Sequence, residues 1–470
     1  MKKILLLLCL AASSIPAAIS QQPRIPDTPV AQVFAAWLTA FNSADRLAVE
    51  QFHHSHGQGE PRNVDRDLAM RERTGGFDLQ AIENETPGSF TALLRERASG
   101  RFGRIRMDVE AAAPHRLIGM RLQPALGPQT SGVQSAPVAR GTEEETLSAT
   151  RSLLERESEA GRFAGAALIA KNGEILFEQA YGLADRAREI RNTTATRFRV
   201  GSMNKMFTAV AILQLVEAGI LALDDKLGKF LPDYPNQRLA ASVTIDHLLT
   251  HRGGTGDFFG PEYFARKDHI RTLDDYIALV GARAPLYEPG TRFEYSNFGY
   301  LLLGAVIERV TGGSYYDYVQ KHVFDRAGMA ASGSEPEERI AGSVSVGYTR
   351  PPGDSVLRPN TQSLPWRGSP AGGGYSTLHD LLAFAEALRT GKLLGADYSG
   401  RMLKGYALRN RLGDDGHGFV GHNGGSPGMN GDLRLYPQSG YVVIALANLD
   451  PPAADAVTEF VDARLSPPGR

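Results

Sequence analysis

Apolar positions near the beginning of the chain follow two different periods. Spacings of three and four residues, which are typical of an amphipathic helix, link Val30, Val33, Phe34, Trp37, Leu38 and Phe41. Apolar and polar residues then alternate in the segments 90–94, 105–109 and 118–122, as in strands of a sheet with one buried face. A helix followed by a meander of strands predicts a small α+β domain over 27–122.

The pattern after the first domain predicts a second and larger one. Thr142 and Glu145 form a capping-box pattern that begins a helix. Pairs of apolar segments separated by turn residues predict β-hairpins within 166–177 and 432–447. Because the segments between these hairpins are mostly helical, strands from both ends are expected to form one antiparallel sheet beside a helical subdomain over 142–470.

Composition separates the two domains and marks the beginning of the chain. Residues 123–141 are rich in Pro, Gly, Ser, Gln and Thr without periodicity, which predicts a linker. Two lysines, a short apolar run and a small-residue cleavage site predict a signal peptide over 1–20, with cleavage near Ser20 and Gln21. The protein is therefore expected to be periplasmic or secreted.

Charge and cysteine content exclude several classes of function. A formal net charge of -1 supplies no basic field for nucleic acid. The single cysteine, Cys9, lies within the predicted signal, so the mature chain is expected to have no disulfide and no cysteine-ligated metal. No later segment is apolar enough to predict stable membrane insertion. Without a matching distant ligand, a polar surface turn rather than a metal site is expected for His53, His54 and His56.

Candidate chemistry begins with Ser202-Met203-Asn204-Lys205, the only Ser-x-x-Lys sequence in the chain. Ser202 precedes a helical pattern, so it could simply be a helix N-cap. Alternatively, Lys205 lies three residues later on the same helix face, where its amine can reach the Ser202 hydroxyl. A buried lysine loses its charge more readily, so it can serve as the base that activates a serine nucleophile.

Two Tyr-x-Asn sequences compete for a role in the same site. Tyr234-Pro235-Asn236 lies in a proline-rich segment and is interpreted as a structural turn. Tyr295-Ser296-Asn297 follows a Glu-Pro-Gly turn and has the composition of a catalytic loop. Tyr295 and Asn297 are therefore the candidates.

Two histidines are followed by glycines, and only one is interpreted as functional. His422-Asn423-Gly424-Gly425 leads toward a predicted strand, where small residues let a substrate approach backbone donors. His251 lies at the end of a predicted helix, where a positive charge suits the C-terminus, so its role is interpreted as structural. The sequence 424–428 also matches a nucleophile elbow, but that motif requires a helix after it and a strand is predicted here.

The order Ser-x-x-Lys, Tyr-x-Asn, His-x-Gly resembles the serine β-lactamase and penicillin-binding protein superfamily. The most similar branch contains class C β-lactamases, D,D-carboxypeptidases, D-aminopeptidases and family VIII carboxylesterases. The resemblance extends from about Glu143 to Leu465 and departs at Arg252-Gly253-Gly254, where relatives usually have Thr-Ser-Gly. It implies a β-lactamase/transpeptidase-like α+β fold. The preceding domain resembles the nuclear-transport-factor-like cone, which would make it either a ligand-binding module or a spacer.

The resemblance also implies a role for each candidate residue. Ser202 would be the nucleophile, while Lys205 and Tyr295 would share general-base and general-acid duty. Backbone N–H groups of Ser202 and the second glycine of the histidine motif would form the oxyanion hole. The substrate and oxyanion residues would be Asn297, His422, Gly424 and Gly425, which is that second glycine. No metal or organic cofactor is implied, and whether the lysine or the tyrosine accepts the first proton stays open.

These observations predict an exported serine hydrolase that forms an acyl-enzyme on an ester, amide or lactam carbonyl. The expected partner is a small molecule or short peptide. The alternative is a non-hydrolytic β-lactam- or peptidoglycan-binding protein or sensor on the same fold. His422 stands where many β-lactamases carry a lysine, so esterase or peptidase activity is expected to exceed β-lactamase activity.

Overall fold

The computed structural model describes residues 23–57, 61–98, 100, 102–125, 141–351, 356–412 and 418–465. Two compact units divide the chain, Met1–Gln129 and Thr130–Arg470. The expected signal peptide lies outside the described residues, as does most of the expected linker. The signal peptide and the exact domain boundaries therefore stay predictions.

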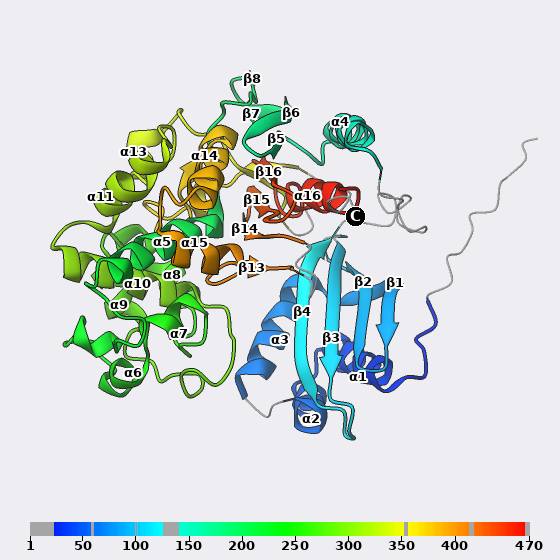
Figure 1. Ribbon diagram of the computed structural model, residues 1–470. Coiled ribbons are helices and arrows are strands. Elements are labelled where there is room, and N and C mark those ends of the chain that lie inside the picture. Colours follow the sequence, from blue (N-terminus) through cyan, green and yellow to red (C-terminus); the bar gives the residue numbers. More distant parts are fainter. Residues whose placement is uncertain are drawn as a thin grey trace, which may run out of the picture. The chain divides into compact units, whose positions relative to one another are not determined.

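The first unit is an α+β domain with an antiparallel sheet, as the apolar pattern predicted. Its elements are α1 Pro29–Ser43, α2 Arg46–His56, α3 Pro61–Thr74, β1 Phe77–Thr86, β2 Ser89–Glu96, β3 Phe102–Val109 and β4 Leu117–Ala125. The strands pair in sequence order, β1-β2-β3-β4 (Figure 1). The apolar stripe of α1 packs on the sheet, and its core aromatic rings include Phe34, Trp37, Phe41, Phe77 and Phe90.

The expectation of a histidine-rich surface turn is wrong. All three histidines lie in the last turns of α2. His53 is buried, with its Nε2 atom 3.1 Å from Oδ2 of buried Asp67. Aromatic packing against Phe52 and the carboxylate of Asp67 therefore explain the position of His53. No group of side chains suited to holding a metal ion occurs among the described residues.

The second unit is built on a six-stranded antiparallel sheet with strands from both of its ends. In spatial order the strands are β13 Arg409–Asn410, β14 Val420–Ser426, β15 Met429–Leu435, β16 Tyr441–Ala447, β5 Gly165–Lys171 and β6 Glu174–Tyr181. The antiparallel sheet next to a helical subdomain confirms the expected fold class.

Helices cover both faces of this sheet. One face packs against α4 Glu143–Glu159 and α16 Asp455–Asp462, and the other against α14 Leu378–Arg389 (Figure 1). Strand alternation sends Leu168 and Ile444 into the core shared with the helical subdomain. Their neighbours Ile169 and Val443 point to the core under α16. The pairing of Ile444 with Leu168 fixes this register, because a one-residue slip would exchange the two faces.

The helical subdomain lies between β6 and β14 in the sequence. Its helices are α5 Asn204–Glu217, α6 Gln237–Ser242, α7 Ile245–Leu249, α8 Pro261–Arg266, α9 Leu273–Val280, α10 Asn297–Thr311, α11 Tyr315–Val319, α12 Asp325–Ala327, α13 Glu337–Ile340 and α15 Ala396–Leu403. Short strand pairs complete it: β7 Leu183–Asp185 with β8 Ile190–Arg191, β9 Phe198–Arg199 with β12 Tyr375–Ser376, and β10 Tyr348–Thr349 with β11 Arg358–Pro359.

Helix α5 is the central helix of the second unit. Its side chains from Asn204 to Leu213 are all buried, and a helix that is apolar on nearly every side is stable only inside a core.

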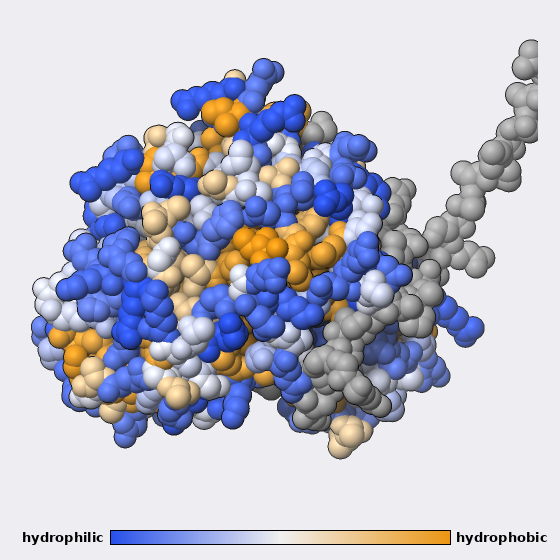
Figure 2. All heavy atoms as spheres, turned by 45° about the horizontal axis from the view of Figure 1, so that its top comes forward, coloured by the Kyte–Doolittle hydropathy of each residue, from blue (hydrophilic) through white to orange (hydrophobic). Residues whose placement is uncertain are grey.

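Within the described residues, no helix has the length and apolar character needed to cross a membrane. The face drawn in Figure 2 is mainly polar, with smaller apolar patches between the polar residues.

Candidate active site

Ser202 and Lys205 lie together where a 3-10 turn enters α5. The turn Gly201–Met203 carries Ser202, and the lysine Nζ lies 3.3 Å from Ser202 Oγ. The Ser202 side chain caps neither the turn nor α5, whose N-cap Met203 makes no side-chain cap bond. Gly201 has φ +51°, a left-handed conformation that favours glycine. The capping interpretation of Ser202 is therefore excluded, and its hydroxyl is available to Lys205.

The Lys205 amine is completely buried and has two further partners. Its Nζ lies 2.7 Å from Asn297 Oδ1 and 2.5 Å from the Ala371 carbonyl oxygen. Asn297 in turn donates from Nδ2 to Asp257 Oδ2 at 2.7 Å. Because a carboxylate accepts hydrogen bonds, Asp257 fixes the orientation of the Asn297 amide and turns its oxygen toward the lysine.

The surroundings of Lys205 lower the pKa of its amine to about 7, because burial disfavours the charged form. The negative charge of Asp257 opposes this effect but does not cancel it. A neutral amine has two N–H donors and one lone pair. The carbonyl oxygens of Asn297 and Ala371 can each take one donor, which leaves the lone pair for the Ser202 hydroxyl.

Tyr295 reaches this group from the beginning of α10. Ser296 caps the helix by accepting from the Gly299 N–H at 2.9 Å, so the preceding Tyr295 and the first helical residue, Asn297, both flank the lysine. The Tyr295 ring centre lies 4.8 Å from Lys205 Nζ, and the residue as a whole is 40 % exposed. Desolvation of the phenol by the surrounding protein raises the pKa of Tyr295 above its usual value, and the hydrogen bond with Ser202 opposes this shift by less. The phenol is therefore protonated at neutral pH and can serve as a proton donor.

His251 lies beside the site, which the sequence interpretation did not anticipate. Its ring stacks on that of Tyr295 at 4.5 Å between centres, and its Nδ1 accepts from the Ser296 N–H at 3.1 Å. Burial and the nearby lysine hold the pKa of His251 well below its usual value. The helix-end explanation required a positive charge and is wrong. A neutral His251 instead supports the loop that carries Tyr295.

Strand β14 brings two glycines against the turn that carries Ser202. A Cβ atom at Gly424 would overlap the Val200 carbonyl oxygen and lie 2.9 Å from the Ser202 amide nitrogen. A Cβ at Gly201 would lie 3.1 Å from the Gly425 nitrogen. Only glycines permit this approach of two backbones. The amide nitrogens of Ser202 and Gly425 therefore lie in neighbouring segments at the mouth of the site.

His422 is buried on the same strand as these glycines. Its ring centre lies 6.4 Å from that of Tyr295, and its Nδ1 lies 2.6 Å from the Asn423 carbonyl oxygen. Burial, with a smaller contribution from Lys205, lowers the pKa of His422 to about 3. A carbonyl only accepts, so Nδ1 carries the proton and Nε2 is an unprotonated acceptor.

The competing motifs have structural roles. Asn236 caps α6 by accepting from the Leu239 N–H at 3.0 Å, and Tyr234 is buried in the helical core. The sequence 424–428 ends β14 and turns into β15, so a strand follows where a nucleophile elbow would need a helix. Tyr234 and Asn236 therefore belong to the framework of the second unit, and the segment 424–428 is not a nucleophile elbow.

Three functional contacts were not identified from the sequence: those of Asp257, His251 and Ala371. Asp257 lies in a loop without a local motif and contacts Asn297, whereas Ala371 contacts Lys205 directly, and both contacts form only when the chain folds. The segments 247–251 and 371–380, which contain His251 and Ala371, carried a usable signal, because both share the resemblance to the superfamily.

Comparison with known proteins agrees with this architecture. The family model described as Beta-lactamase matches residues 150–465. Penicillin-binding protein 4 from Amycolatopsis lactamdurans is 31 % identical over 309 residues, which cover 60 % of this chain and 80 % of that protein. The crystal structure of a penicillin binding protein from Bacillus halodurans is similar with 33 % identity and a TM-score of 0.61, covering 66 % of this chain and 99 % of that chain. A D-stereospecific amidohydrolase from Streptomyces sp., at 24 % identity, shares the fold with a TM-score of 0.57, covering 68 % of this chain and 98 % of that chain.

Proposed function

The chain belongs to the β-lactamase family, and we propose that it hydrolyses small esters, amides or lactams through an acyl-enzyme on Ser202. The observation that carries this proposal is the buried lysine amine 3.3 Å from the serine oxygen, with the carbonyl oxygens of Asn297 and Ala371 at 2.7 and 2.5 Å from the same nitrogen. This geometry supports Lys205 as the first proton acceptor. A binding protein that never formed an acyl-enzyme would have no use for this arrangement.

The proposed acylation begins when the Ser202 proton passes to Lys205 Nζ and Oγ bonds to the substrate carbonyl carbon. The carbonyl oxygen becomes negatively charged and accepts from the N–H groups of Ser202 and Gly425. When the tetrahedral intermediate collapses, the leaving group takes a proton from the Tyr295 hydroxyl. The proton on Lys205 then passes to Tyr295. In deacylation the same steps run in reverse with a water molecule in place of the leaving group, so that water attacks the acyl carbon, the bond to Ser202 Oγ breaks and the acid is released.

The pH dependence of hydrolysis tests this proposal. Only neutral Lys205 accepts a proton, and its pKa is about 7. We therefore expect kcat/KM for a short-chain p-nitrophenyl ester to rise with pH to a plateau, with a midpoint near neutrality. The rate should be lost as acid protonates the lysine. A profile that is flat or falls across this range would contradict the lysine as base.

A separate screen tests the function itself with ester, D-amino-acid amide and cephalosporin substrates. The function would be refuted if none of them were turned over and mass spectrometry detected no acyl-enzyme.

The neutral state of His422 predicts a preference among these substrates. Many β-lactamases hold the substrate carboxylate with a lysine, whereas His422 presents an uncharged acceptor with a pKa of about 3. We expect kcat/KM for the ester to be well above that for a chromogenic cephalosporin. We also expect His422→Lys to raise the cephalosporin value relative to the ester by about tenfold, or roughly 1.4 kcal/mol. A wild-type enzyme that prefers the cephalosporin by more than about tenfold would overturn this argument.

A further inference from the structure

The peptide between Gly424 and Gly425 has a support on the face of the sheet that packs against α16. Its carbonyl oxygen, on Gly424, accepts from Asn430 Nδ2 at 3.0 Å. Its N–H, on Gly425, is the proposed oxyanion donor. Because a peptide group is planar, fixing the direction of the carbonyl also fixes the direction of the N–H. A hydrogen bond to the carbonyl further polarises the group and strengthens the N–H as a donor.

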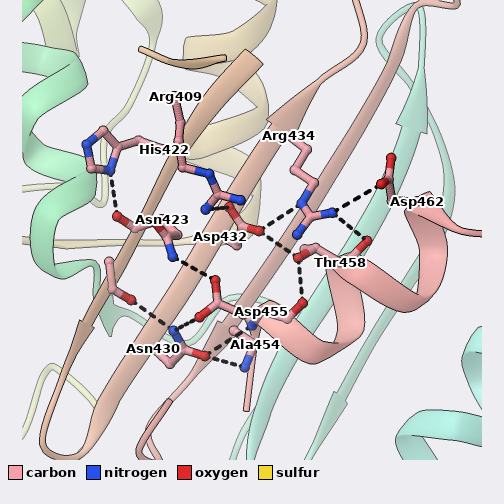
Figure 3. A network of polar contacts seen from close by, with 11 residues as sticks. Arg409, His422, Asn423, Asn430, Asp432, Arg434, Ala454, Asp455, Thr458 and Asp462 are labelled. Atoms are coloured by element: carbon pink, nitrogen blue, oxygen red, sulfur yellow. Dashed lines mark hydrogen bonds and ion pairs between the residues drawn. The ribbon is translucent and has the colours of Figure 1, made fainter. Parts of the chain in front are cut away.

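Asn430 is itself held by the beginning of α16. It lies on β15 opposite Gly425 and is completely buried. Its Oδ1 accepts from the N–H groups of Ala454, at 2.7 Å, and Asp455, at 3.1 Å. Its Nδ2 donates to Asp455 Oδ2 at 2.8 Å as well as to Gly424 (Figure 3). With every partner of the amide assigned, Asn430 has one orientation, in which its nitrogen faces the Gly424 carbonyl.

The carboxylate of Asp455 connects Asn423 on β14 with Asn430 on the neighbouring strand β15. Its Oδ1 accepts from Asn423 Nδ2 at 2.9 Å, while Oδ2 accepts from Asn430 (Figure 3). The carbonyl of Asn423 is the partner of His422 Nδ1. One acidic side chain on α16 therefore holds the segment of β14 that carries both His422 and the Gly424–Gly425 peptide.

We propose that Asp455 and Asn430 are positioning residues that orient and polarise the Gly424–Gly425 peptide as an oxyanion donor. This inference rests on the proposed function, since it concerns the same acyl-transfer site. The effect of Asp455 and Asn430 is transmitted through the backbone of β14 to the N–H of Gly425.

The test compares Asp455→Asn with a control that also removes a bond between α16 and the sheet. Asparagine can accept through only one of its two terminal atoms, so either Asn423 or Asn430 would face an N–H₂ group and turn away. The control Tyr436→Phe removes the Tyr436 hydroxyl bond to Asp462 Oδ1, which is 2.9 Å long and lies at the other end of α16. Two quantities are measured: the acylation rate, from the nitrophenolate burst with a p-nitrophenyl ester, and the affinity for a boronic acid. The boronic acid forms a tetrahedral adduct with Ser202 and places an oxygen in the oxyanion position.

We expect Asp455→Asn to lower the acylation rate and the boronic acid affinity by the same factor, at least about tenfold, because both depend on the oxyanion donor. Tyr436→Phe should lower the melting temperature without either loss. If Asp455→Asn does not fold, Asn430→Ser tests the same contact, since serine is too short to reach the Gly424 carbonyl. A folded variant that keeps both wild-type values would overturn the positioning role alone. Failure of the wild-type protein to become acylated on Ser202 would instead refute the proposed function.

Discussion

Replacing Ser202 with alanine is expected to abolish covalent labelling by a fluorophosphonate or penicillin probe and to lower ester turnover at least about a thousandfold. Among the described residues, Ser202 is the hydroxyl placed 3.3 Å from a buried amine whose pKa is about 7. An alanine at this position has no oxygen to form the acyl bond. The variant should fold, because the Ser202 side chain caps no helix. Intact-protein mass spectrometry measures the label, and a p-nitrophenyl ester assay measures the rate.

The matched control for this change is Ser426→Ala. Ser426 ends β14, is exposed, and belongs to the sequence that imitates a nucleophile elbow. The same loss of one hydroxyl should leave labelling and turnover near wild-type values. A label that persists in Ser202→Ala, or one that maps to Ser426, would show that the nucleophile has been assigned incorrectly.

The fold class was predictable because the helices and strands of each unit carry strong local patterns. Residues such as Phe34 and Trp37 recur at helical spacing, and the strands β5 and β16 are continuous apolar runs bounded by turns. These local signals need no knowledge of distant partners. The Ser-x-x-Lys spacing was equally informative, since a helix places residues three apart on one face.

Strand β14 could not be predicted from such local signals. Its sequence, Val-Gly-His-Asn-Gly-Gly-Ser, has little intrinsic preference for a strand. It becomes one because it pairs along its whole length with β15. The glycines that weaken it are also what permits contact with the turn around Ser202. Propensity and function therefore conflict here, and tertiary pairing decides the outcome.

The supporting residues of the site were hidden for a related reason. Asp257 contacts Asn297 across 40 positions of sequence, and Asp455 contacts Asn423 across 32. Neither aspartate belongs to a motif. His251 was misinterpreted because a helix end normally favours the protonated ring, whereas burial and the lysine charge dominate once the fold is formed. Long-range packing and desolvation thus determine these contacts and the charge state of His251, which the local pattern of residues does not reveal.

Replacing Lys205 with methionine is the second change with a large expected effect, a loss of about a thousandfold in the acylation rate. Methionine has a similar length and suits a buried position, but it cannot accept the Ser202 proton. The substitution also leaves the oxygens of Asn297 and Ala371 without their donor, at a cost of about 1–3 kcal/mol for each unsatisfied group. Stability must therefore be measured by thermal unfolding beside the rate. Lys229→Met is the matched control, since Lys229 is exposed and pairs with Asp225 at the surface.

The pH profile separates loss of the base from loss of stability in Lys205→Met. In the wild-type protein the rate should fall in acid as the lysine takes up a proton around its pKa of about 7. Methionine does not titrate, so the residual rate of the variant should lack this acid limb even where the variant is fully folded. If Lys205 had only a structural role, its replacement would lower the rate at every pH and leave the shape of the pH profile unchanged. A folded variant that keeps the neutral midpoint, or retains acylation within about tenfold of wild type, would assign the proton transfer to another group, with Tyr295 next to be tested.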